Sequence, residues 1–305
     1  MNRTRNNACE TARTRALVQP PTPQHYQTPA RPLRAPPRYT FYMPPAAWGW
    51  EITPAELESW ILEHTPQWLV LNKPPYVVCH PSKRGPWSSL AGACREYLGL
   101  QRVHMPFRLD RETSGVVVIA KDPATASQMQ RAVQQRRVRK IYLAILTGEL
   151  GEAVTVDAPI GRLGATRVAI RQGVIEGGQR AVTRFIPLHS EGGYTLARVE
   201  PETGRLHQIR VHAAHIGHAI AGDKIYGPDE SLFLEFLESG FSPRLASALP
   251  LPRHALHCAE VHFDPAAWCP SGLHFHAPLF PDLKMGASES APGVPGGINR
   301  PFPFL

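Results

Sequence analysis

Apolar residues along the chain recur in two patterns, short runs typical of β-strands and longer amphipathic stretches typical of helices. Strands are predicted where apolar residues run together or alternate with polar ones, at residues 68–71, 116–120, 141–147, 194–200 and 256–263. Helices are predicted at residues 56–63, 124–133, 206–216 and 232–238. Strands and helices are mixed without a regular βαβ repeat. The pattern therefore predicts an α+β domain built on a mixed, largely antiparallel sheet flanked by helices.

Two proline-rich ends bracket this pattern. Residues 1–45 hold nine prolines and seven arginines, and residues 286–305 are rich in Gly, Pro and Ser. Both compositions predict disordered or flexible tails around one folded domain at residues 46–285. The N-terminal tail is interpreted first as a solvated basic segment, with non-specific attraction to phosphate groups as the alternative.

The formal net charge of +8 favours an acidic partner, nucleic acid before an anionic membrane surface. Residues 1–45 carry +6 of that charge, so the rest of the chain has only about +2. Net charge is therefore weak evidence that the folded domain itself binds nucleic acid.

The five cysteines are odd in number and form no C-x-x-C pair. This usage predicts a reduced, cytoplasmic compartment without a disulfide framework. No apolar run reaches the roughly 18 residues that a membrane span needs. An organelle transit peptide is the alternative for the Arg-rich start, but the prolines from Pro20 onward disfavour its amphipathic helix. A monomer without protein partners is the default expectation.

The most informative acidic residue is Asp110, which lies between Arg108 and Arg111 and just before a Thr-Ser-Gly turn into the strand at 116–120. A turn at the lip of a buried strand holds a carboxylate rigidly, as a nucleophile or general base requires. A surface turn with local ion pairs is the alternative.

Basic residues crowd the approach to the next strand, where Lys140 and Tyr142 lie. Four arginines precede them without an intervening acid, at positions 131, 136, 137 and 139. A basic lip beside an aromatic ring suits an unstacked base. A solvated helix end is the alternative.

Histidines gather in two further segments. A metal site on the first would use His212, His215 and His218, but the spacing matches no common zinc motif. The second group is interpreted as histidines on and before a strand, and comprises His254, His257, Cys258 and His262. Neither group predicts a metal centre, and the chain has no Gly-rich phosphate loop that would predict a nucleotide cofactor.

Taken in order, these segments resemble the RluA family of RNA pseudouridine synthases. The family pattern H/F-R-L-D-x-x-T-S-G matches residues 107–115, and K-x-Y-x-A matches residues 140–144. The pattern G-R-x-H-Q-I/L-R-x-H matches residues 204–212, and G-H-x-I-x-G-D-x-x-Y-G matches residues 217–227. Shorter matches are N-K-P-x-x-x-x-x-H-P at 72–81 and R-x-x-L-H-A at 253–258, where Cys258 replaces the usual alanine. The resemblance covers residues 66–285.

The resemblance implies the pseudouridine synthase fold with a central active-site cleft, and the conversion of uridine to pseudouridine in structured RNA, ribosomal or transfer. It implies that Asp110 is the catalytic carboxylate, that Arg210 pairs with it through a bidentate fork, and that Tyr142 stacks on the target base. Arg108 is expected to fill the gap left by the flipped base. Further RNA contacts are expected from the remaining matched or basic residues, Lys73, Arg136, Arg137, Arg139, Lys140, His207 and Gln208.

The resemblance implies no metal and no cofactor. A non-catalytic RNA-binding module of the same fold is the main alternative function, and a metal-dependent hydrolase built on the histidines is a weaker one. The family's separate RNA-binding domain is not recognisable in residues 1–45, and the segment 228–252 between two motifs is a candidate for substrate selection.

Overall fold

The structure, a computed structural model, describes residues 50–80 and 85–283. The predicted tails at 1–45 and 286–305 lie outside the described residues. Within the described ranges, no helix is both long and apolar enough to cross a lipid bilayer.

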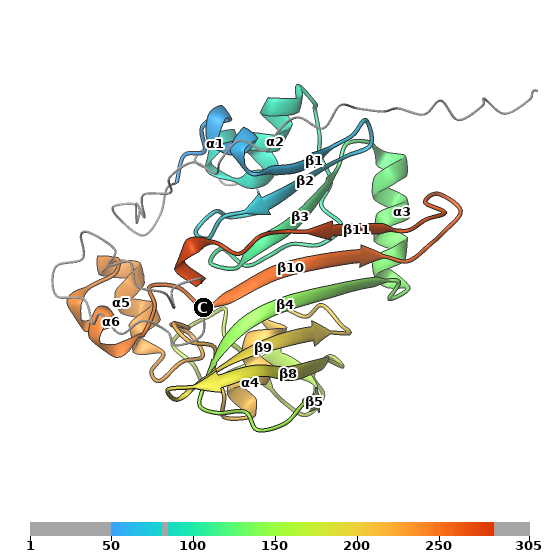
Figure 1. Cartoon of the computed structure of the whole chain (residues 1–305). Helices are drawn as coiled ribbons and strands as arrows, with labels where there is room; N and C mark the ends of the chain where they lie inside the picture. Colours follow the sequence, from blue (N-terminus) through green and yellow to red (C-terminus); the bar gives the residue numbers. More distant parts are fainter. Residues whose placement is uncertain (1–49, 81–84, 284–305) are drawn as a thin grey trace, which may run out of the picture. The chain divides into compact units, whose positions relative to one another are not determined.

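A nine-stranded sheet forms the centre of the described part of the chain (Figure 1). Its strand order is β1-β2-β3-β10-β4-β9-β8-β5, and β11 also pairs with β10. Among these described strands the neighbours run antiparallel, except that β3 and β10 are parallel. The strands are β1 (Ile61–His64), β2 (Trp68–Lys73), β3 (Ser114–Ala120), β4 (Val138–Thr147), β5 (Val154–Asp157), β8 (Val182–Glu191), β9 (Tyr194–Pro201), β10 (Leu256–Phe263) and β11 (Leu273–His276). This arrangement confirms the predicted mixed, largely antiparallel sheet of an α+β fold.

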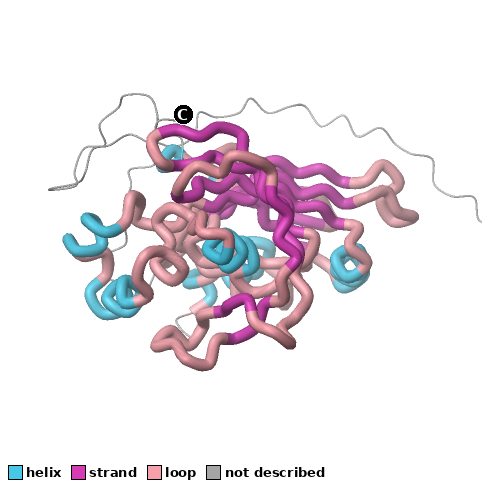
Figure 2. The backbone as a smooth tube through the Cα atoms, turned by 90° about the horizontal axis from the view of Figure 1, so that it is seen from below, coloured by secondary structure: helices cyan, strands magenta, loops and turns pink. Residues whose placement is uncertain are grey.

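Most of the helices lie on one side of the strand layer (Figure 2). The α-helices are α1 (Pro54–Ser59), α2 (Leu90–Leu98), α3 (Pro123–Gln134), α4 (Gln208–His215), α5 (Ser231–Ser239) and α6 (Pro243–Ala248). Two short 3₁₀ turns, η1 (Pro86–Ser88) and η2 (Pro281–Leu283), and a small hairpin of β6 (Ile160–Arg162) and β7 (Gln172–Val174) complete the described elements. The face of the sheet toward the viewer in Figure 1 is left without a layer of helices.

Local sequence explains where several helices begin. Thr53 and Glu56 form a reciprocal capping box at α1, in which the Glu56 amide donates to Thr53 Oγ1 and the Thr53 amide donates to Glu56 Oε2. The carboxylate of Asp122 accepts from the Thr125 amide and so begins α3.

Two predicted helix boundaries are wrong. The helix predicted at 56–63 ends at Ser59, because Ile61 and the residues after it pair with β2 as strand β1. The helix predicted at 206–216 begins at Gln208, because His207 takes a left-handed backbone conformation with φ of 56°. In addition, α2, α6, β1, β5 to β8 and β11 were not predicted.

The core is centred on β3, whose seven residues are all buried. At its start, Gly115 has a φ of 112°, and a Cβ there would lie 2.1 Å from the carbonyl oxygen of Cys258. The parallel contact between β3 and β10 therefore requires glycine at this position. Beside it, Ser114 Oγ lies 2.9 Å from His257 Nδ1 and Thr113 Oγ1 lies 2.8 Å from His254 Nε2. These two buried pairs fix the end of the loop that carries Asp110.

The buried His257 makes stability sensitive to mild acid. Burial lowers the pKa of His257 from 6.5 to about 4, so the folded state resists the proton that the unfolded chain takes up. The stability due to the neutral imidazole is fully present above pH 6.5 and is lost as the pH falls toward 4. Its loss amounts to about 2 kcal/mol at pH 5.

We expect the free energy of unfolding of a His257→Gln variant to fall by about 2 kcal/mol less than that of the wild type between pH 7 and pH 5. Urea unfolding at the two pH values measures the difference. His189→Gln, at an exposed position on β8, is the matched control and should behave as wild type. An equal loss in the wild type and His257→Gln contradicts the assignment.

Candidate active site

A cleft of about 940 Å³ opens where the loop 105–113, β4, α4 and α5 meet. Its lining includes Asp110, Tyr142 and Arg210, which lie far apart in sequence, together with the exposed Arg108. The structure thus brings together four of the residues that the sequence selected.

Asp110 is held by its own loop. Its carbonyl accepts the Thr113 amide at 3.2 Å, and the preceding Leu109 is buried. The Asp110 side chain keeps 26% of its surface exposed to the cleft, so the carboxylate is anchored at its backbone and accessible at its tip.

The predicted contact between Asp110 and Arg210 is present, with Arg210 Nη1 2.9 Å from Asp110 Oδ2. Its geometry differs from the expected bidentate fork, because that fork is made with Asp223 instead. Arg210 Nε donates to Asp223 Oδ2 at 2.6 Å and Nη2 donates to Asp223 Oδ1 at 2.9 Å. The Arg210 guanidinium therefore joins two carboxylates. The buried Asp223 orients the guanidinium, and the guanidinium in turn holds Asp110 toward the cleft.

Electrostatics keep Arg210 and Asp223 ionised. Burial by itself disfavours the charge on Arg210, but Asp223 and then Asp110 outweigh it and raise the pKa of the guanidinium. Burial likewise disfavours the Asp223 carboxylate, yet Arg210 holds the pKa of Asp223 well below its usual value. A buried charge is tolerated when its partners satisfy it in this way.

Asp223 is a site residue that the sequence interpretation missed. It also accepts the amides of Ile225 at 2.9 Å and Tyr226 at 3.0 Å, which fixes the turn after it. The available signal was its place in the matched segment 217–227, which was noted without assigning Asp223 a role.

His207 faces Asp110 from the other side, with Nε2 3.9 Å from Asp110 Oδ2. Its Nδ1 lies 2.8 Å from the Tyr226 hydroxyl, which accepts the Gln172 amide. Burial, reinforced by Arg210, lowers the pKa of His207 to about 4. His207 is therefore a neutral imidazole beside the carboxylate.

Lys140 and Tyr142 are two residues apart on β4, so their side chains point to the same face, and both line the cleft. Tyr142 is 7% exposed, and burial raises the pKa of its phenol well above the usual value, so the hydroxyl is protonated at neutral pH. The Lys140 ammonium lies 5.4 Å from the ring centre of Phe107. Burial lowers the pKa of Lys140.

Other residues predicted to contact RNA are not part of the cleft. Lys73 is fully buried and donates to the carbonyls of Pro74, Val77 and Arg111 at 2.8 to 3.1 Å. Burial lowers its pKa to about 8. Its place in the interior corrects the expectation of an RNA contact, because its three donors already hold the backbone around the Asp110 loop.

Strand alternation separates the basic residues before Lys140 from the cleft. Arg139 faces away from it, because successive side chains on a strand point to opposite faces. Arg136 also lies outside the lining, and Arg137 donates to the carbonyl of Pro265. Of the predicted basic lip, the structure places only Lys140 in the lining of the cleft.

Gln208 borders the cleft, but its polar atoms are used internally. Its amide donates to Val182 and Thr183 at 2.9 Å, and its oxygen accepts from Thr203 and the Arg205 amide. These hydrogen bonds fix the start of α4 and leave no free polar atom on the Gln208 side chain for a direct RNA contact.

A second buried ion pair, also missed from sequence, supports the Asp110 loop. Lys224 Nζ lies 2.9 Å and 3.0 Å from the two Glu112 oxygens and 4.6 Å from the ring centre of Phe236 on α5. Because Phe236 lies on α5, the contact with Lys224 links the Asp110 loop to the segment 228–252. Phe233 and Phe236 of that segment line the cleft.

Among the described residues, neither histidine group considered from sequence brings three of its own ligand atoms together. His212 lies 2.9 Å from Thr183 Oγ1 and 3.0 Å from the Ala158 carbonyl, and His218 lies 2.9 Å from the Thr147 carbonyl. In the second group, His254 and His257 are bound to β3 as described, and His262 lies on the opposite face in a different cluster with Glu260 and His274.

Comparison with known proteins shows which family this chain is similar to. The sequence model of the RNA pseudouridylate synthase family matches residues 67–215. An uncharacterized RNA pseudouridine synthase of Bacillus subtilis is 34% identical over 222 residues, which cover 71% of this chain and 71% of that protein. The ribosomal large subunit pseudouridine synthase D of Pseudomonas aeruginosa is 36% identical over 201 residues, which cover 64% of this chain and 61% of that protein.

A solved structure agrees with the sequence relatives. The human RNA pseudouridylate synthase domain containing 1 has a TM-score of 0.56 and 26% identity, and the match covers 73% of this chain and 85% of that one. The chain spans between 50% and 77% of the length of the curated relatives it matches. From its matched motifs, its fold and these relatives, the chain belongs to the RNA pseudouridylate synthase family, in the RluA group.

Proposed function

We propose that this chain isomerises uridine to pseudouridine in structured RNA. The observation that supports this most directly is the Asp110 carboxylate, which Arg210 holds by a hydrogen bond at the mouth of a cleft that also contains Tyr142. The reaction breaks the bond from ribose C1′ to uracil N1 and forms one from C1′ to C5. The proton on C5 is lost and N1 gains one, so reactant and product have the same atoms.

Asp110 is the group that acts on the uridine. An ionised carboxylate can attack the sugar or the base, or can remove a proton, and each role requires the charge and orientation that Arg210 supplies. The neutral imidazole of His207 lies beside it, with Nε2 3.9 Å from Asp110 Oδ2. The intact triplet of Asp110, Arg210 and Asp223 is more than a non-catalytic binding module needs.

Tyr142 offers a flat ring on the cleft wall on which a base removed from its stack can lie. Arg108 is exposed at the edge of the same cleft. We assign it the space that the flipped uridine leaves in the RNA, because its long charged side chain can enter the helix from this edge. Lys140 supplies a cation to the phosphate backbone.

Ribosomal RNA is the proposed substrate class, since relatives such as the Pseudomonas aeruginosa protein are named for the ribosomal large subunit. Transfer RNA stays open as the other class expected from sequence. We further propose that the enzyme acts as a monomer in a reducing compartment such as the cytoplasm. The four described cysteines are free thiols.

Removing the charge on Asp110 tests the proposed chemistry. We expect Asp110→Asn to abolish pseudouridine formation and to leave RNA affinity within a few-fold, because the amide is isosteric but cannot act as nucleophile or base. Pseudouridine mapping of ribosomal RNA from a strain lacking the gene identifies the target, and single-turnover assays on that RNA measure the loss. The matched control is Asp229→Asn at an exposed surface position. Near-normal turnover by Asp110→Asn would refute the assignment.

Arg210→Lys and Asp223→Asn test the positioning of Asp110. Lysine cannot reproduce the fork to Asp223, and asparagine loses its charge. We expect each change to lower kcat by about 100-fold, the cost of misplacing a reacting group by about 1 Å. KM for the RNA should stay within a few-fold, and circular dichroism of each variant separates misplacement from unfolding. A rise in KM at unchanged kcat is the result that contradicts a positioning role.

Lys140 and Arg139 form a matched pair, adjacent in sequence but on opposite faces of β4. We expect Lys140→Ala to weaken RNA binding and to reduce its salt dependence by roughly one phosphate contact. Arg139→Ala should leave both unchanged. Filter-binding titrations between low and moderate salt measure these effects, and equal losses in the two variants would place the RNA on both faces.

A further inference from the structure

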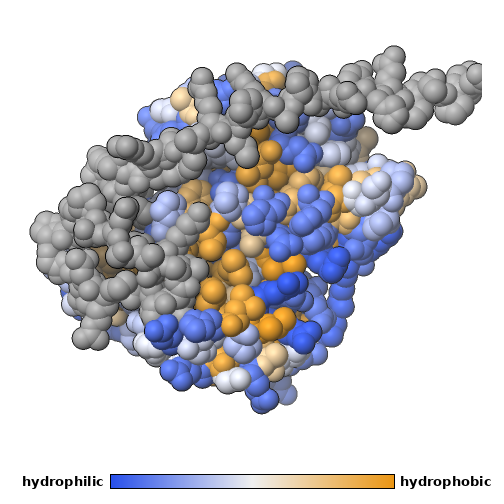
Figure 3. All heavy atoms as spheres, in the orientation of Figure 1, coloured by the Kyte–Doolittle hydropathy of each residue, from blue (hydrophilic) through white to orange (hydrophobic). Residues whose placement is uncertain are grey.

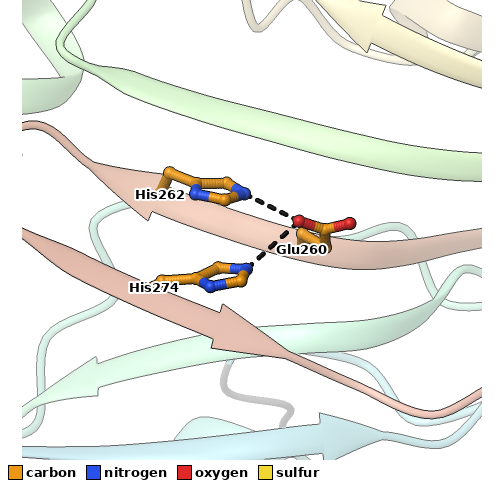
Figure 4. Close-up of side chains that lie close together, drawn as sticks. All are labelled: Glu260, His262 and His274. Atoms are coloured by element: carbon orange, nitrogen blue, oxygen red, sulfur yellow. Dashed lines mark hydrogen bonds and ion pairs between the residues drawn. The ribbon is translucent and has the colours of Figure 1, made fainter.

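Three side chains of the β10–β11 hairpin converge on one point outside the cleft (Figure 4). His262 Nε2 lies 2.8 Å from Glu260 Oε2, and His274 Nε2 lies 3.1 Å from the same oxygen. The two imidazole rings are stacked, with their centres 4.0 Å apart and their planes 13° apart. One atom from each of the three residues lies within 4.8 Å of the others.

The sheet itself builds this arrangement. The antiparallel register places His262 directly opposite His274, and Glu260 lies two residues before His262 on the same face. Directly opposed side chains on paired strands are about 5 Å apart at Cβ. The cluster therefore rests on paired backbone and needs no loop to order before it forms.

This cluster is separate from the active site. Val261 is the β10 partner of Lys140, which lines the cleft, so Glu260 and His262 on either side of Val261 point to the opposite face. That face carries no layer of helices (Figures 1 and 2). Figure 3 shows hydrophilic residues beside hydrophobic ones on it. His274 is 56% exposed on its side chain, which leaves the cluster open to ions from solvent.

Two imidazole nitrogens and one carboxylate oxygen are a donor set that zinc accepts, with water as the fourth ligand. Bonds of about 2.0 to 2.2 Å in a tetrahedral site separate the ligand atoms by about 3.3 Å. The nitrogen–oxygen separations of 2.8 Å and 3.1 Å are close to that value. An ion enters when the two rings rotate out of their stacked arrangement, and each neutral imidazole that binds it through Nε2 carries its proton on Nδ1.

The ligand atoms of the cluster and the charges near it determine which class of metal ion it can bind. One carboxylate contributes to the cluster, and the exposed Arg139 is the β4 neighbour of His262. Magnesium and calcium need several oxygen ligands, whereas imidazole nitrogen suits zinc, nickel and copper.

We propose that Glu260, His262 and His274 bind a divalent transition metal ion of the zinc type, which joins β11 to β10. The chain after β11 holds elements that support the active site. The Ala277 carbonyl lies 3.1 Å from His257 Nε2, and Asp282 Oδ1 accepts from Arg253 Nη2 at 3.1 Å. The bound ion therefore stabilises the hairpin and the segment that covers His257 and Arg253, without touching the cleft.

The test is zinc binding by the full-length, untagged chain after treatment with a chelator. A Cys9→Ser background removes one competing thiol outside the described residues. Isothermal titration with zinc chloride should give one ion per chain, and zinc should raise the thermal unfolding midpoint. Either His274→Ala or Glu260→Gln should weaken zinc affinity by about tenfold or more and abolish the thermal shift.

The matched control is His189→Ala, which removes an exposed strand histidine that lies 3.4 Å from Glu191. It should bind zinc as the parent does. Uridine turnover should be the same in parent and His274→Ala, so the result does not depend on the proposed activity. If the parent binds no zinc, or if His274→Ala binds it equally tightly, the cluster is an ion-pair network of Glu260 with two histidines and the proposal is overturned.

Discussion

The arrangement of the cleft depends on one buried guanidinium that is shared between two carboxylates. Arg210 is removed from water on α4, and its charge is tolerated because Asp223 takes its fork and Asp110 takes its remaining edge. Removing one partner from such a buried group leaves a charge without compensation, which costs several kcal/mol. The helix, the turn at 222–226 and the Asp110 loop are therefore fixed relative to one another by a single electrostatic requirement.

Further buried pairs extend this constraint outward. Glu112 binds Lys224, and Thr113 Oγ1 lies at hydrogen-bond distance from His254. The end of the Asp110 loop is therefore held by residues that lie far from it in the sequence. Arg253, fully buried, pairs with Asp282 and donates to the Glu112 carbonyl at 3.2 Å. The matched sequence motifs are thus the parts of one polar network. A catalytic carboxylate needs such a network because it must stay charged and oriented at the edge of a low-dielectric interior.

The alternation of β4 and β10 divides the molecule's chemistry between two faces. Lys140 and Tyr142 face the cleft, whereas Arg139 and the cluster of Glu260 and His262 face the side without helices. A register shift between Cys258 and Glu260 sets which residues of β10 face each side. Charged residues that are adjacent in the sequence therefore lie on opposite faces of the sheet, and the two faces can bind different partners.

The sequence by itself determined the fold class and the five main strands, and it selected Asp110, Tyr142 and Arg210, which the structure brings to one cleft, because apolar periodicity and ordered motifs are local properties. It also pointed to the contact between residues 110 and 210. It did not show that Asp223 takes the guanidinium fork, that Lys73 is buried, or that Arg139 turns away from the cleft. Those outcomes depend on strand register and on which polar groups meet in the interior. Hydrogen-bond geometry between distant segments exists only after the chain has folded, so only the tertiary structure decided them.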